Sequence, residues 1–167
     1  MDERLKVLQT VPIFGALQPE TLGFLCEHLT EVDLDAGEYF FRQGEMGDAV
    51  YVLEAGRAEV IRSRKEQAVT LTSLEPGACF GEIALLAICP RSASVRAMER
   101  SRAVRLEHKV LFELYGRDLE QFTLLQMNLG REVARRLNDT TDLLLALLQE
   151  AADPQPGAIG QLANSLK

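Results

Sequence analysis

Histidine is scarce in this chain of 167 residues, and three common catalytic motifs are missing from it. The two histidines, His28 and His108, lie far apart and form no metal-ligand pattern, which disfavours barrel enzymes that hold iron or manganese through clustered histidines. The sequence has no Gly-x-Ser-x-Gly elbow, no Cys–His signature and no glycine-rich P-loop. We therefore predict that the chain is not an enzyme and binds no metal.

Long apolar runs and paired cysteines are also missing. The N-terminal residues lead into an amphipathic segment, so no signal peptide is expected. The densest leucine run, Leu143 to Leu148, is far shorter than the ~18 apolar residues that a membrane span needs. The three cysteines, Cys26, Cys79 and Cys89, are odd in number and unclustered, which is typical of reduced thiols in the cytosol. These features predict a cytoplasmic protein with no membrane partner.

Acidic residues outnumber basic ones, with 25 Asp and Glu against 18 Lys and Arg and a formal net charge of −7. A protein that binds nucleic acid needs a basic face to neutralise phosphates, so this balance speaks against nucleic acid as a partner. It does not forbid a small basic pocket. Hydrophobic residues make up 47% of the chain, and at this length we expect one globular domain with a buried core.

The residue pattern changes along the chain from helical to β and back to helical. Leu5 to Phe14 has apolar residues at helical spacing, and Pro19 opens a second helix that continues to Leu29. From Glu31 to Leu106, short alternating runs are separated by glycine-containing turns, which is typical of an all-β sandwich or barrel. The helical pattern then returns from Glu107.

A long helix is predicted from Asp118 to about Glu150, and a continuous helix of that length would span ~50 Å, more than a compact domain of this size. Its apolar stripe favours a parallel homodimer through residues 118–150. The alternative is a helix folded back over the β domain, which a break near Asn138-Asp139 would allow. The expected organisation is 1–116 for the β domain with its N-terminal helices, 117–152 for the lid and dimer helix, and 153–167 for a flexible tail.

The stretch from Phe80 to Val95, called the cassette below, has the residues to bind an anion. Glu82 opens an apolar turn, and Arg91 stands just beyond its end. The N–H groups at a helix N-terminus attract anions, a guanidinium binds them through a fork of two donors, and a carboxylate accepts hydrogen bonds from hydroxyls. On spacing alone, an ordinary Glu82–Arg91 ion pair beside a buried turn explains the pattern equally well.

Gly81-Glu82, followed by Pro90-Arg91-Ser92-Ala93, resembles the phosphate-binding cassette of the cyclic-nucleotide-binding domain family. The glycine pattern from Gly37 to Gly56 resembles the β-roll of the same family. The resemblance implies an α+β fold, in which an antiparallel, jelly-roll-like β-roll is flanked by N-terminal helices and a long C-terminal dimerisation helix.

The resemblance also assigns roles to residues. It places Arg91 on the cyclic phosphate and Glu82 on the ribose 2′-hydroxyl, with Asp48 as a supporting partner of Arg91. The remaining contacts expected from the cassette are Gly81, Ile83, Ala84, Ser92 and Ala93.

The base is expected to be read by the C-terminal helix, because residues 134–141 resemble the dimer helix of the catabolite activator protein branch of this family. Carried over, Thr140 contacts the base in its own pocket, Thr141 the base in the partner's pocket, and Arg136 stacks on or bonds the base. The alternatives are a solvent-facing Arg136 and threonines that mark a weak point or the start of a new helix. Ser92 is compatible with cAMP and cGMP, whereas the two threonines favour cAMP.

The predicted function is a cAMP-leaning binding and sensing module that signals to a separate partner protein through its dimer and lid-helix geometry. Two alternatives stay open. One is a scaffold subunit with a vestigial pocket, and the other is the sensor part of a transcription regulator that lacks its DNA-binding domain.

Overall fold

The computed structural model describes residues 5, 8–65 and 67–152, and the chain forms two compact units, Met1–Glu132 and Val133–Lys167. The predicted tail of residues 153–167 lies outside the described residues. The helical elements are η1 (Pro12–Phe14), α2 (Pro19–His28), α3 (Glu82–Ala87), α4 (His108–Arg117) and α5 (Leu119–Ala152). Leu5 and residues 8–10 are also helical, as the sequence predicts.

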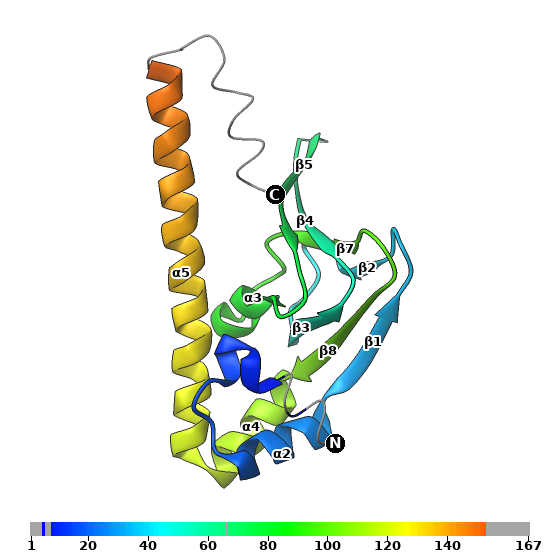
Figure 1. Cartoon of the computed structure of the whole chain (residues 1–167), viewed down its shortest axis with the longest axis vertical. Coiled ribbons are helices and arrows are strands. Elements are labelled where there is room, and N and C mark those ends of the chain that lie inside the picture. The colour runs from blue at the N-terminus through cyan, green and yellow to red at the C-terminus, as the bar shows by residue number, and fades with distance from the viewer. Residues whose placement is uncertain (1–4, 6–7, 66, 153–167) are drawn as a thin grey trace. The chain divides into compact units, whose positions relative to one another are not determined.

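Two four-stranded antiparallel sheets form the body of the first unit (Figure 1). One sheet has the strand order β1-β8-β3-β6 and the other has the order β2-β7-β4-β5. The strands are β1 (Thr30–Leu34), β2 (Tyr39–Phe41), β3 (Ala49–Ala55), β4 (Ala58–Arg64), β5 (Gln67–Leu74), β6 (Cys79–Phe80), β7 (Ser94–Ala97) and β8 (Ser101–Glu107). The predicted α+β fold with an antiparallel β-roll is therefore confirmed.

An aromatic cluster fills the space between the two sheets. Tyr51 of β3 stacks on Phe80 of β6 with ring centroids 5.3 Å apart, and Phe40 and Phe41 of β2 contact both rings. Phe40 and Phe41 are consecutive, and the irregular pairing of β2 with β7 between Tyr39 and Phe41 allows both rings to face the inside of the roll. The cassette begins at Phe80, so its first residue is anchored in this core.

A second core joins the helices of the first unit to the sheet that contains β8. Leu25 of α2, Leu111 of α4 and Leu125 of α5 are fully or almost fully buried in it. Buried amide side chains add polar contacts, since Asn128 Nδ2 donates to the carbonyls of Ile13 (3.2 Å) and Gly15 (2.8 Å). Helix α5 therefore starts from a fixed position against the N-terminal segment.

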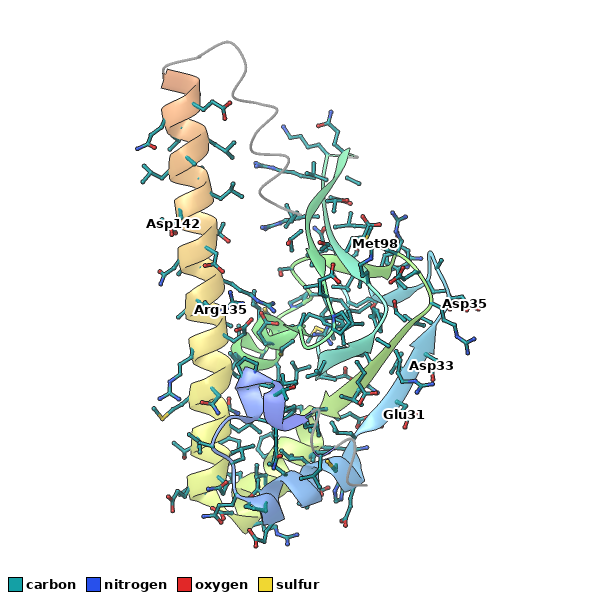
Figure 2. All side chains as sticks on the ribbon, viewed as in Figure 1. Glu31, Asp33, Asp35, Met98, Arg135 and Asp142 are labelled. Carbon is teal, nitrogen blue, oxygen red and sulfur yellow. The ribbon has the colours of Figure 1, made fainter. Side chains whose placement is uncertain are left out.

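Helix α5 runs through Asn138 and Asp139 without the break that the folded-back alternative needs. Thr140 and Thr141 lie inside the helix, where their hydroxyls donate to the carbonyls of Arg136 and Leu137, so neither residue starts a new helix. In the second unit, Arg135 pairs with Asp139 one helical turn further on, and Figure 2 shows Arg135 and Asp142 on α5. The exposed leucines of this unit are Leu137, Leu144, Leu145, Leu147 and Leu148.

We predict that Phe80→Ala lowers the free energy of unfolding by about 3–5 kcal/mol, because it leaves a cavity among packed rings. Phe80 is 2% exposed, whereas Phe112 on α4 is 63% exposed and serves as the matched control. Phe112→Ala is expected to cost less than about 1 kcal/mol. Urea unfolding of both variants checks this, and equal losses would contradict the proposed role of the aromatic core.

Candidate functional site

The cassette folds as a short helix between two residues in left-handed conformation. Gly81 precedes α3 with φ 85°, and Ile88 follows it with φ 49°. Pro90 then pairs with Met46 across an isolated β-bridge. The main-chain N–H of Arg91 donates to the carbonyl of Glu45 (2.7 Å), so the end of the cassette is fixed to the turn before β3.

The Arg91 side chain points into the protein and is 3% exposed. Its Nη1 donates to the carbonyl of Gly81 and its Nη2 to the carbonyl of Ala49, both at 2.8 Å. The guanidinium carbon lies 4.1 Å from the centre of the Phe41 ring, a favourable cation–π distance. Burial lowers the pKa of Arg91, while the charges of Tyr51 and Asp48 oppose this shift.

The Arg91 guanidinium keeps donors that these contacts do not use. Its Nε is buried and has no hydrogen-bond partner among the described residues. A guanidinium has five N–H donors, and two of them serve the carbonyls of Gly81 and Ala49. A buried donor of this kind fits an anionic ligand such as a phosphate, which accepts several charge-assisted hydrogen bonds.

Two glycines allow the main chain to come close to Arg91. A Cβ on Gly81 would lie 2.6 Å from Arg91 Nη1, and a Cβ on Gly47 would lie 2.2 Å from the Cβ of Ala84. The added Cβ on Gly47 would also lie 3.3 Å from the guanidinium carbon of Arg91. The site is thus a cradle in which backbone, helix α3 and guanidinium are in direct contact.

The other predicted residues of the cassette differ in exposure. Glu82, the first residue of α3, is buried, and so are Ala84 and Ala93. Ile83 and Ser92 are exposed, and Gly81 is half-buried. All of these residues lie in the first unit, next to Arg91 in the chain. Arg136, Thr140 and Thr141 belong to the second unit, where both threonines are exposed.

Asp48 lies between two guanidinium groups, one of which the sequence analysis missed. Its Oδ1 is 4.0 Å from Arg91 Nη2, and its Oδ2 is 2.7 Å from Arg105 Nη2. The closer partner of Asp48 is therefore Arg105 and not Arg91. Arg105 lies opposite Tyr51 in the pairing of β8 with β3, a register that short motifs in the sequence do not reveal.

The structure contains no metal-binding group of three or more His, Cys, Asp or Glu side chains in its described part. Among the same residues, none of the helices combines the length and the hydropathy that a membrane crossing requires.

Comparisons with known proteins agree with this geometry. A family model described as the cyclic nucleotide-binding domain matches residues 31–118, which include both sheets and the cassette. The cAMP-dependent protein kinase regulatory subunit of Emericella nidulans is 38% identical over 109 residues, which cover 65% of this chain and 26% of the relative. The cyclic AMP receptor protein of Thermus thermophilus is 33% identical over 138 residues, which cover 82% of this chain and 62% of the relative.

A solved structure shows the same architecture. The crystal structure of the Thermus thermophilus catabolite activator protein aligns with a TM-score of 0.70 at 33% identity, covering 83% of this chain and 63% of that one. This chain therefore spans about a quarter of the fungal regulatory subunit and less than two thirds of the bacterial protein.

We predict that Gly47→Ala lowers the free energy of unfolding by about 1–3 kcal/mol, because the added methyl group forces α3 away from the turn before β3. Gly23→Ala is the matched control, since nothing lies within 4 Å of its added Cβ in α2. Alanine is the better helix former, so this control is expected to raise stability by about 0.5–1 kcal/mol. Thermal or urea unfolding measures both, and an unperturbed Gly47→Ala would contradict the close packing.

Proposed function

The chain belongs to the cyclic nucleotide-binding domain family, and on this premise we propose that it binds a cyclic nucleotide in the cassette, with cAMP preferred. The observation that carries the proposal is the buried guanidinium of Arg91, which holds an unused donor beside two close glycines. A cyclic phosphate is a compact anion that suits such a donor.

Each cassette residue has a proposed role in holding the ligand. The fork of Arg91 binds the cyclic phosphate, and the carboxylate of Glu82 accepts a hydrogen bond from the ribose 2′-hydroxyl. The main chain at Gly81, Ile83 and Ala84 supplies further N–H donors. The exposed hydroxyl of Ser92 and the buried Ala93 complete the proposed set of contacts.

The base is proposed to be read by Thr140, Thr141 and Arg136 of α5. A threonine hydroxyl can accept a hydrogen bond from the adenine amino group and donate one to a ring nitrogen. The names of the kinase regulatory subunits and of the receptor protein refer to cAMP, which supports cAMP over cGMP as the ligand. The cassette alone does not separate the two nucleotides, so cGMP stays possible.

The second half of α5 is proposed to form a homodimer and to pass ligand occupancy to a separate protein partner. Leu137, Thr141, Leu144 and Leu148 are exposed and follow one another at steps of four, three and four residues, which places them in one stripe. A stripe of this kind is typical of a helix that packs against a second copy. Closure of α5 over the base would then bias the geometry of the dimer.

The proposed module is regulatory and not enzymatic, and its proposed location is the cytoplasm. The relatives are named as regulatory subunits, a receptor protein and transcriptional regulators. Among the described residues, Cys26, Cys79 and Cys89 form no disulfide, which is compatible with a reducing compartment.

The sensor part of a transcription regulator is the second candidate function. It is favoured by one observation, namely that the match covers 82% of this chain but 62% of the Thermus thermophilus receptor protein. Reading the gene beyond Lys167 for a DNA-binding domain decides between a stand-alone module and a sensor part.

We predict that Arg91→Ala weakens cAMP binding by about tenfold or more, the effect of losing charge-assisted hydrogen bonds worth about 1.5–3 kcal/mol. Arg91→Lys keeps the charge but loses the fork, so it is expected to bind more weakly than the wild type as well. Arg57→Ala is the control, because this arginine is half exposed and lies 3.6 Å from Glu99.

Titration calorimetry with cAMP, cGMP and cyclic dinucleotides provides the measurement, together with thermal unfolding without ligand to show that each variant folds. The wild type is expected to bind cAMP more tightly than cGMP. If the wild type shows no binding to any of these nucleotides, the proposed function is rejected and the scaffold subunit is favoured. Equal affinities of the wild type and both Arg91 variants would reject the phosphate role.

We further predict that Leu144→Lys converts a homodimer into a monomer, because a charged side chain in an apolar seam between helices loses its hydration. Gln149→Lys is the matched control, since Gln149 is exposed on the same helix and lies outside the stripe. Analytical ultracentrifugation measures the masses of the three proteins. A wild type that sediments as a monomer would refute the proposed dimer.

A further inference from the structure

A row of alternating charges connects the phosphate-binding arginine to the start of α4. Asp48 lies 4.0 Å from Arg91 and 2.7 Å from Arg105. Arg105 in turn lies 2.9 Å from Glu107. Lys109 ends the row, with its Nζ 2.7 Å from Glu107. The row crosses from Asp48, which directly precedes β3, to Arg105 and Glu107 of β8, and its inner part lies beside the cradle of Arg91.

Arg105 is the central member of this row and is firmly held. Its side chain is 25% exposed, and its two terminal nitrogens bind Asp48 and Glu107 at the same time. Burial lowers the pKa of Arg105, but its hydrogen bond to Asp48 and the charges of Tyr51, Asp48 and Glu107 outweigh this effect, so the pKa is raised. Like other arginines in proteins, Arg105 therefore carries a positive charge at neutral pH.

Asp48 lies near both Arg91 and Arg105, so the arginine with which it pairs affects the positive charge at the ligand site. Its side chain is 67% exposed, and each of its two carboxylate oxygens faces one of the two guanidinium groups. Arg91, Asp48 and Arg105 together carry a charge of about +1 at neutral pH. A cyclic nucleotide brings one negative charge on its phosphodiester, which this sum balances.

We propose that Arg105 is a positioning residue for nucleotide binding, which holds and neutralises Asp48 so that the guanidinium of Arg91 keeps its charge for the phosphate. The proposal rests on the proposed function of the cassette. Without Arg105, Arg91 is the arginine left beside Asp48, and a closer Asp48–Arg91 ion pair through Nη2 would compete with the phosphate for the same guanidinium group.

Four variants and one control test this role by titration calorimetry with cAMP. Arg105→Gln removes the charge and is expected to weaken binding about three- to tenfold, the size expected for a partly exposed charge pair. Arg105→Lys keeps the charge and is expected to bind within about threefold of the wild type. Asp48→Asn removes the competitor and is expected to bind as tightly as the wild type or more tightly.

The affinity of the double variant Arg105→Gln, Asp48→Asn distinguishes the proposed role of Arg105 from a merely structural one. It is expected to recover the affinity that Arg105→Gln loses, because no carboxylate is left to compete for Arg91. The loss in Arg105→Gln is also expected to shrink at 1 M salt.

The control is Arg102→Gln on the same strand. Arg102 pairs with Asp33 at 3.0 Å, and Figure 2 shows Asp33 on the edge strand β1. This variant is expected to leave the affinity for cAMP unchanged.

The outcomes separate this inference from the proposed function. A wild type without affinity for any cyclic nucleotide refutes both. A wild type that binds, with Arg105→Gln within twofold of it or with no recovery in the double variant, refutes the role of Arg105 alone. If Arg105→Gln fails to fold, Asp48→Asn decides, because weaker binding by that variant would show that Asp48 supports Arg91 and would overturn the proposal.

Discussion

The buried guanidinium of Arg91 is the constraint on which the first unit depends. A charge that leaves water is tolerated only where other groups replace its hydration. Here the carbonyls of Gly81 and Ala49 accept its hydrogen bonds, and the ring of Phe41 covers its face. Carbonyls can reach a side chain in this way only if the main chain passes close by. That requirement explains glycine at positions 47 and 81, where a Cβ would meet Ala84 or Arg91 itself.

The same constraint shapes the helix that carries the cassette. Helix α3 has left-handed residues at both ends, and one of them is Ile88, a β-branched residue with φ 49°. Such a conformation costs free energy and persists only where the surroundings impose it. The β-bridge between Pro90 and Met46 and the bond from Arg91 N–H to the carbonyl of Glu45 impose it here. Tertiary contacts, and not local helix propensity, therefore set the geometry of the cassette.

Features that depend on local sequence could be predicted from it, whereas features that depend on tertiary contacts could not. The cassette and the antiparallel strands were predictable because they rest on short motifs and on alternation. The pairing of Asp48 with Arg105 was not, because it joins residues far apart in sequence through the register of β3 and β8. The continuity of α5 was also uncertain, since Asn138 and Asp139 are poor helix formers. In the structure, Arg135 lies one helical turn before Asp139 and pairs with it, which supports the helix at this point.

The described part of the second unit, residues 133–152, has a different physical problem, because it contributes no residue to a buried core. The two buried clusters of the described residues contain no residue beyond Leu129. Helix propensity alone stabilises a water-exposed helix only marginally, and most helices gain their stability from an apolar face that is buried. In this unit the apolar face includes five leucines that are 49% to 65% exposed. Burying them against a second copy would remove apolar surface from water at about 25 cal/mol per Å². The first unit is stabilised by its own buried core. The exposed leucines of the second unit are instead typical of one side of an interface between helices.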